Sequence, residues 1–113
     1  MAILPETDLR RIEQWAAAQW PERFRDEVFW EVHTRGRNVT VCETRAPWGG
    51  GTDWTHQSLA QLRYRPETSD WALHWADRNS RWHVYDPDGF PVIGTAAELL
   101  AEIDRDPTAI FKG

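Results

Sequence analysis

The sequence predicts an α+β fold, in which an N-terminal and a C-terminal helix lie on one face of a mainly antiparallel meander of about five strands. Apolar and polar residues alternate between residues 59 and 86, as they do in half-buried strands. A helical apolar stripe precedes this segment, and a capping box follows it. With 113 residues, we expect one domain over residues 1–113 with one core.

The first helix is expected over residues 7–20. Its apolar stripe at helical spacing consists of Leu9, Ile12 and Ala16. Glu6 and Asp8 are acidic residues at the end of the helix where its dipole favours negative charge. Pro21 ends the helix, because proline disfavours helical backbone in the residue before it.

Two strands are expected next, over residues 27–34 and 39–45, with Gly36 supplying the positive φ of a hairpin turn. This pairing puts Glu43 and Arg45 on the apolar face near the end of the sheet. A carboxylate and a guanidinium in such places need partners. We expect an ion pair between them or at the rim; the alternative is a buried anchor in a ligand site.

Residues 46–57 form the longest expected loop, which contains three consecutive glycines. The glycines do not match the pattern of a phosphate-binding loop. Trp48 and Trp54 flank them, and two interpretations stay open. The tryptophans either close over a ligand as a lid or pack the loop onto the core.

Residues 59–86 are interpreted as three consecutive antiparallel strands, with turns at 66–70 and 77–80. A two-residue loop at 78–79 would set the register of the last two strands. The opposed pairs in that register are Trp75 with Trp82, Leu73 with Val84, His74 with His83, and Ala72 with Tyr85. Tryptophans then share the apolar face, and histidines share the polar face.

The predicted polar face of this sheet collects the candidate ligand-binding residues. They are Arg63, Arg65, His74, Arg81, His83 and Tyr85, with Trp48 and Trp54 on the neighbouring loop. Cations and aromatic rings on a sheet suit anionic ligands or nucleic acid, through charge and stacking. A net charge of −5 disfavours nucleic acid, whose binding proteins usually have a basic surface. The alternative is a plain solvent-facing sheet.

After a turn at residues 86–89, residues 90–94 are expected to add a short extended piece. The last helix begins at Thr95, which forms a capping box with Glu98, and Pro107 stops it. Ile110 and Phe111 are expected to dock back onto the sheet.

Catalytic and metal-binding patterns are weak in this chain. Two histidines, His74 and His83, are too few for a recognisable zinc site, so we expect no metal and no cofactor. Cys42 lies in the middle of a strand and is interpreted as a packing residue. Asp104 and Asp106 are expected to cap turns or pair with a nearby cation rather than to act as a catalytic carboxylate pair.

A single cysteine excludes an internal disulfide and is typical of a reducing compartment. No stretch resembles a signal peptide or is long enough to span a bilayer, so we expect a cytoplasmic protein without membrane contact. The eight tryptophans make the chain tryptophan-rich, and we expect some of them near the surface or at an interface. The oligomeric state is left open.

Five segments carry a family resemblance: VTVCETR from residue 39, AQLRY from 60, WALHW from 71, WHVY from 82 and LLAEIDRDPTAIFKG from 99. Together they resemble a bacterial family of unknown function, DUF3024, over nearly the whole chain. The matching motif residues are Glu43, Arg45, Arg63, Tyr64, Trp71, Trp82, Tyr85, Asp104, Asp106, Pro107 and Phe111. The family pattern requires neither His74 nor His83, and the resemblance implies no activity.

The sequence therefore favours a small, non-enzymatic binding or interaction module that uses the polar face and the 46–57 loop, with a protein or a small anionic ligand as its partner. One alternative is a nucleic-acid-binding accessory domain that uses Arg63, Arg65, Arg81 and Tyr85. Another is an uncharacterised enzyme with a histidine-based site.

Overall fold

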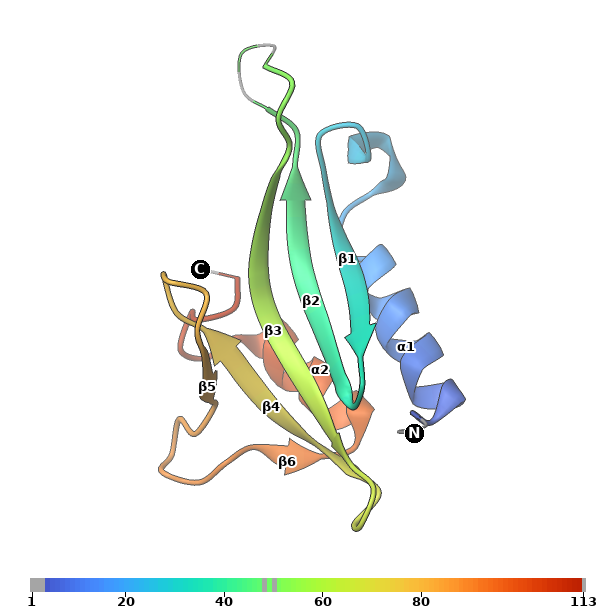
Figure 1. Ribbon diagram of the computed structural model, residues 1–113, viewed down its shortest axis with the longest axis vertical. Coiled ribbons are helices and arrows are strands. Elements are labelled where there is room, and N and C mark those ends of the chain that lie inside the picture. Colours follow the sequence, from blue (N-terminus) through green and yellow to red (C-terminus); the bar gives the residue numbers. More distant parts are fainter. Residues whose placement is uncertain (1–3, 48, 50, 113) are drawn as a thin grey trace.

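The computed structural model describes residues 4–47, 49 and 51–112 and shows an α+β fold (Figure 1). The elements in chain order are α1 (Glu6–Ala17), the 3-10 helix η1 (Glu22–Phe24), β1 (Val28–Arg35), β2 (Asn38–Arg45), β3 (Thr55–Arg65), β4 (Asp70–Ala76), β5 (Trp82–Val84), β6 (Ile93–Gly94) and α2 (Ala96–Arg105). The predicted order of helix, meander and helix is confirmed. No helix in the described ranges is long and apolar enough to cross a membrane.

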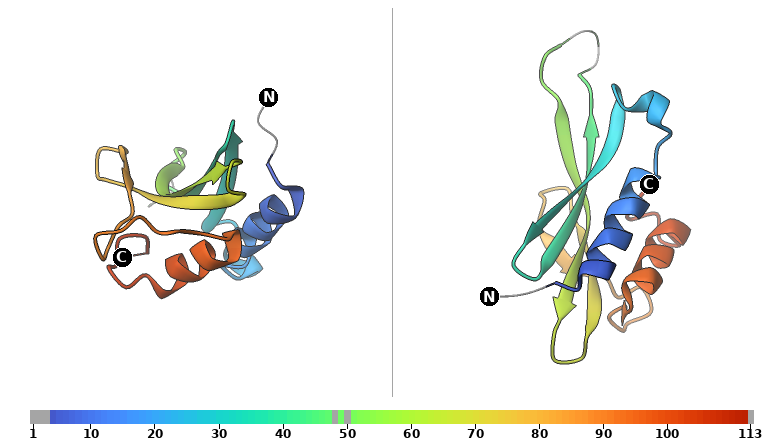
Figure 2. Two further views of the ribbon diagram at one scale, coloured as in Figure 1. Left: turned by 90° about the horizontal axis from the view of Figure 1, so that it is seen from below. Right: turned by 90° about the vertical axis from the view of Figure 1, so that its right-hand side faces the viewer.

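The strands form one antiparallel sheet in the order β1-β2-β3-β4-β5, and β6 pairs with β4 beyond the end of β5. Both helices pack on the same face of this sheet, as the left view of Figure 2 shows. The other face carries no helix, and we call it the open face. The predicted placement of both helices on one face is confirmed.

The core lies between the helices and the sheet. Its largest fully buried side chains are Trp71, Tyr85, Ile12, Leu62, Leu73, Leu99, Ile103, Val39 and Val41. They come from both helices and from alternate positions of the strands, as period-2 and helical patterns require. Burial of these apolar surfaces is the main favourable term in folding.

Two indole groups fasten α1 to the rest of the fold. Trp71 in β4 donates its Nε1–H to Asp8 Oδ2 at 2.9 Å, and Trp15 in α1 donates to Asp104 of α2 at 3.1 Å. The predicted capping box at the start of α2 is confirmed, since Thr95 and Glu98 exchange side-chain and backbone hydrogen bonds. These contacts set the position of both helices below the sheet.

Two element boundaries differ from the prediction. Helix α1 ends at Ala17 rather than at residue 20, and a short 3-10 helix follows Pro21. The loop predicted over residues 46–57 is shorter, because β3 begins at Thr55 and pairs along β2 through Gln57. A bulge at Ser58 to Ala60, opposite Val41 and Cys42, lets this polar end of β3 continue the ladder.

The predicted register of β4 and β5 is wrong by one residue. The connection is a three-residue loop in which Ser80 takes a φ of 61°, so Trp75 lies opposite His83 and His74 opposite Val84. The Asp77 carboxylate holds this loop, because its Oδ1 accepts the backbone N–H groups of Asn79 and Arg81 at 2.8 and 3.0 Å.

The shifted register exchanges the faces of the last strand. His83 and Tyr85 lie on the helix-covered side, where His83 stacks on Trp75 with ring centroids 4.7 Å apart. Tyr85 is buried against Phe111, whose predicted docking is confirmed. Trp82 and Val84 lie on the open face instead. His74 and His83 are therefore on opposite sides of the sheet and cannot share a ligand.

This register predicts unequal costs for two neighbouring truncations. Tyr85→Ala empties a buried site and should lower the free energy of unfolding by about 3–5 kcal/mol. Val84→Ala removes a side chain that is 44% exposed and should change it by less than about 0.5 kcal/mol. Urea unfolding of both variants measures the difference. A larger loss for Val84→Ala than for Tyr85→Ala would contradict the register.

Candidate functional site

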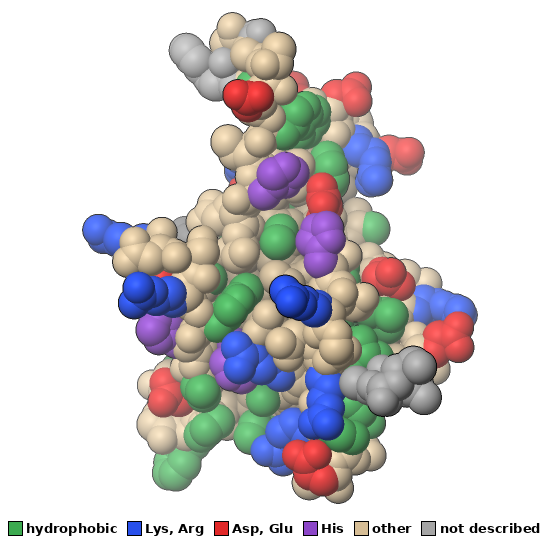
Figure 3. Space-filling model, viewed as in Figure 1, with side chains coloured by type: hydrophobic (Ala, Val, Ile, Leu, Met, Phe, Trp, Pro, Cys, Tyr) green, Lys and Arg blue, Asp and Glu red, His purple; other side chains and the backbone are tan. Residues whose placement is uncertain are grey.

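The open face brings together arginine and histidine side chains from the strands β1, β3 and β4 (Figure 3). Its lower part contains a cross-strand row in which Asn38 pairs with Arg35 on one side and with Arg63 on the other. The next row up contains Gln61 opposite His74. Within the ranges that the structure describes, neither Arg35 nor Arg63 forms an ion pair with a carboxylate.

A chain of side-chain hydrogen bonds orients Arg63. Thr40 accepts the Gln61 amide Nε2–H at 3.0 Å, and Gln61 Oε1 accepts the Arg63 Nε–H at 2.7 Å. Only the Nε atom of this guanidinium is used, so its two terminal nitrogens make no hydrogen bond to any described residue. Arg63 thus presents a positioned fork of N–H donors, the geometry that binds a carboxylate or a phosphate.

His74 lies beside this arginine and is 8% exposed. Its Nδ1 atom is buried and has no hydrogen-bond partner among the described residues, although buried polar atoms are normally paired. Burial lowers the pKa of His74, and the charge of Arg63 lowers it further, against an opposing effect of the Ala72 carbonyl. The site therefore offers a neutral imidazole next to an unneutralised guanidinium.

A second polar group, at the upper part of the open face, was missed by sequence reasoning. The Thr44 hydroxyl lies 3.0 Å from Glu31 Oε1 and 2.9 Å from His56 Nδ1, and His33 Nε2 lies 2.9 Å from Glu31 Oε2. Glu31 thereby links two histidines from β1 and β3. Alternation of side chains along β1 and β3 is the one sequence signal for this group. It was not recognised because His56 lies in a segment that was predicted to be a loop.

Cys42 lies on the same face, between the two polar groups. Burial raises the pKa of its thiol, Glu31 raises it further, and a hydrogen bond with Ser58 opposes them. A raised pKa disfavours the thiolate, which is the reactive form of cysteine. This supports the interpretation of Cys42 as a packing residue.

The other predicted ligand-binding residues are less available. Arg65 is on the open face but is paired with Asp70, at 2.7 Å from Nε to Oδ1. Arg81 lies in the loop before β5, and His83 pairs with Asp77 on the helix-covered side at 2.7 Å. That contact lowers the pKa of Asp77 to about 2. Tyr85 donates its hydroxyl to Glu102 from within the core, so its placement on the polar face was wrong.

Glu43 and Arg45, the candidates for a buried ion pair, form an ion pair with 2.7 Å from Nε to Oε1, in which the Arg45 side chain is 54% exposed. It lies at the rim of the helix-covered side, where Trp30 Nε1 donates to the other Glu43 oxygen at 3.0 Å. Both residues line an open cavity of about 520 Å³ between the sheet, the end of α1 and the C-terminal segment. This cavity is a separate feature from the open face.

The loop between β2 and β3 supplies one tryptophan to the open face. Trp54 packs against Phe29, with ring centroids 6.0 Å apart, at the upper end of this face. Phe29 and Arg35 are at opposite ends of β1, roughly 20 Å apart at the rise of a strand. Trp54 is therefore remote from Arg63, and a lid made by it cannot cover the arginine row. Trp48 lies outside the described residues.

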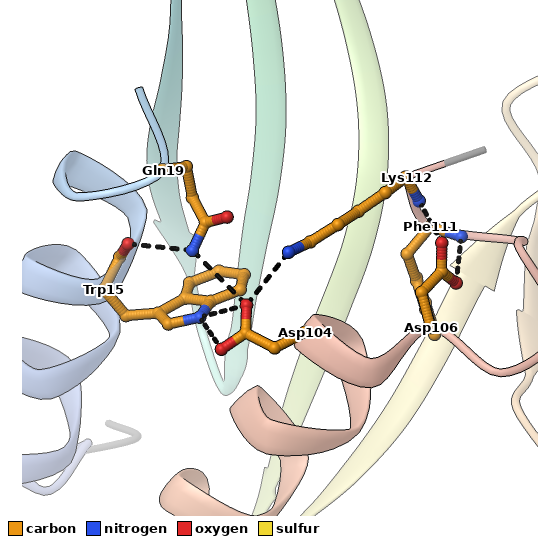
Figure 4. A network of polar contacts seen from close by, with 6 residues as sticks. All are labelled: Trp15, Gln19, Asp104, Asp106, Phe111 and Lys112. Atoms are coloured by element: carbon orange, nitrogen blue, oxygen red, sulfur yellow. Dashed lines mark hydrogen bonds and ion pairs between the residues drawn. The ribbon is translucent and has the colours of Figure 1, made fainter. Parts of the chain in front are cut away.

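The carboxylates at the end of α2, Asp104 and Asp106, make structural contacts (Figure 4). Asp104 accepts hydrogen bonds from Trp15 and pairs with Lys112 Nζ at 3.0 Å, while Asp106 accepts the backbone N–H groups of Phe111 and Lys112. These contacts confirm turn capping and pairing with a nearby cation. No three histidine, cysteine or acidic side chains in the described part of the chain are grouped as metal ligands.

Comparison with known proteins identifies one family. A family model described as a domain of unknown function (DUF3024) matches residues 2–113. No curated protein and no solved structure matches the chain. The family description carries no activity, so any function must be argued from the site.

The lowered pKa of His74 predicts a pH dependence of stability. The unfolded chain takes up the proton near the ordinary value of 6.5, whereas the folded chain resists it. Stability should therefore be complete above pH 6.5 and decline as the pH falls toward the folded pKa. Urea unfolding of wild type and His74→Gln between pH 5 and 8 measures this.

As the pH falls over this range, the free energy of unfolding should decrease more steeply for wild type than for His74→Gln. The control Arg10→Gln changes an exposed arginine, which does not titrate between pH 5 and 8, and should keep the wild-type slope. Equal slopes for wild type and His74→Gln would contradict the assignment.

Proposed function

The chain belongs to the DUF3024 family, and we propose that this member is a non-enzymatic binding module that takes an anionic group on its open face, at Arg63 and His74. The anionic group is a carboxylate or a phosphate, carried by a protein or by a small molecule.

The observation that carries this proposal is the free guanidinium fork of Arg63. Its Nε–H is held by Gln61, which removes part of the conformational freedom that binding would otherwise cost. The terminal nitrogens are left for two parallel hydrogen bonds to an oxyanion. His74 lies beside this fork, and its Nδ1 atom is buried, so the ligand contacts fall to the guanidinium.

The charge around the site favours one anionic group over a polyanion. Arg35 and Arg63 flank Asn38, but Arg65 is already neutralised by Asp70. A phosphate backbone needs several such cations in line, and the chain carries a net charge of −5. Nucleic acid is therefore the weaker alternative.

The proposal places the protein in the cytoplasm, because a single cysteine suits a reducing compartment. It assigns Cys42 no catalytic part, in keeping with the raised pKa of its thiol.

Titration of the ¹⁵N-labelled protein with citrate and with inorganic phosphate tests this function by NMR. We expect saturable shifts at the Arg63 Nε–H signal and at the backbone amides of Gln61 and His74. Charge-assisted hydrogen bonds contribute about 1.5–3 kcal/mol, so Arg63→Gln should weaken binding by roughly 10- to 100-fold.

The matched control is Arg10→Gln, which removes an exposed arginine of α1 and should leave the affinity unchanged. Preference for citrate identifies carboxylates as the ligand class, and preference for phosphate identifies phosphates. Equal affinity of wild type and Arg63→Gln for both anions would overturn the proposal. Tight binding of a single-stranded DNA that weakens steeply with salt would replace it with the nucleic-acid alternative.

A further inference from the structure

Strand β1 is at one edge of the sheet, and its outer side pairs with no strand in the described part of the chain. Arg35 and Asn38 close the two-residue hairpin loop between β1 and β2, so they form a hydrogen-bonded pair. In an antiparallel ladder, such pairs recur at every second residue along β1. The Ala46 N–H donates to the Glu27 carbonyl at 2.8 Å, which continues the same series.

The intervening residues of β1 therefore direct their backbone groups away from β2. They are Val28, Trp30, Val32 and Thr34. No described residue outside the ladder makes a backbone hydrogen bond to them. Strand β1 is eight residues long and contains neither proline nor lysine, the residues that commonly protect an exposed edge against pairing.

A groove of about 400 Å³ runs along this free edge, between β1 and α1. The right view of Figure 2 shows α1 beside the edge, with no other element in front of it. Small side chains of α1, Ala16 and Ala17, line the groove on one side, and Trp20 lines its end. Alternate side chains of an added strand can enter this groove while its backbone pairs with β1.

The charges at the groove indicate the chemistry of its occupant. Glu13 and Glu22 line it and form no ion pair with any described residue. Arg25 also lines it, but its guanidinium lies over the Phe29 ring, 5.2 Å from the centroid. Because Arg25 is itself exposed, the two glutamates and this arginine together give the groove lining a net charge of −1, which favours a cationic partner.

We propose that β1 accepts an extended segment of a partner polypeptide as an additional strand, in which both apolar residues and lysine or arginine are among the side chains that face the groove. Main-chain hydrogen bonds to Val28, Trp30 and Val32 hold the segment. Of its groove-facing side chains, the apolar ones fill the groove and the cationic ones meet Glu13 and Glu22. This surface is independent of the anion site, because it lies at the edge of the sheet.

The probe for this test is a blocked peptide of the same length as β1, in which valine and lysine take turns at the groove-facing positions and threonine occupies the positions between them. In ¹H–¹⁵N spectra, its titration should shift the amides of Val28, Trp30 and Val32 more than those of Phe29 and Glu31. Val32→Pro removes one outward N–H without touching the ladder and should weaken binding at least about tenfold.

The matched control is Val84→Pro, which removes an outward N–H at the opposite edge of the sheet and should bind the peptide like wild type. Two further peptides test the chemistry on the unchanged protein. One carries N-methyl groups on alternate residues and should not bind, because it cannot complete the ladder. The other replaces lysine with glutamate and should bind at least about tenfold more weakly.

Equal binding of the N-methylated peptide, or equal effects of Val32→Pro and Val84→Pro, would overturn strand addition. Equal binding of the glutamate peptide would overturn the cationic partner. Sedimentation of the protein without peptide tests whether a second copy of the chain occupies the edge instead. A dimer that Val32→Pro dissociates would mean that the edge is taken by a second copy of the chain, contrary to the proposal.

Discussion

The Asp77 carboxylate determines which side of the sheet each residue of the last strand occupies. By accepting the N–H groups of Asn79 and Arg81, it holds a loop of three residues between β4 and β5. Because side chains alternate with a period of two, a loop shorter by one residue would move Tyr85 out of the core and Val84 into it. The core around Tyr85 and the composition of the open face both depend on this turn.

The coarse fold follows from patterns that act locally. The helical stripe of α1, the capping box at Thr95 and the alternation along the strands are each decided by neighbours in sequence, and all three match the structure. The details that differ depend on contacts between distant residues. Thr55 to Gln57 look like loop by composition, yet the bulge opposite Val41 carries them into the ladder.

The candidate site was predictable only in part, for the same reason. Arg63 and His74 were placed on one face by alternation within their own strands, which does not depend on a neighbour's register. His83 and Tyr85 were misplaced because their face depends on a loop length that hydrophobic pattern alone chose wrongly. The group around Glu31 was missed because its members come from three strands, and only the assembled sheet makes them neighbours.

The two indole contacts that fasten α1 also bear on the order in which the chain folds. Asp8 and Trp71 are 63 residues apart in sequence, and Trp15 and Asp104 are 89 apart, whereas the hairpins pair close neighbours. Closing a long loop costs more chain entropy than closing a hairpin, and that entropy is lost before the contact is made. We expect the meander to form first and α1 to dock onto it late, with φ-values near zero at Asp8. During synthesis, α1 would then wait, exposed, for the strands and for α2, which follow it in the chain and anchor it.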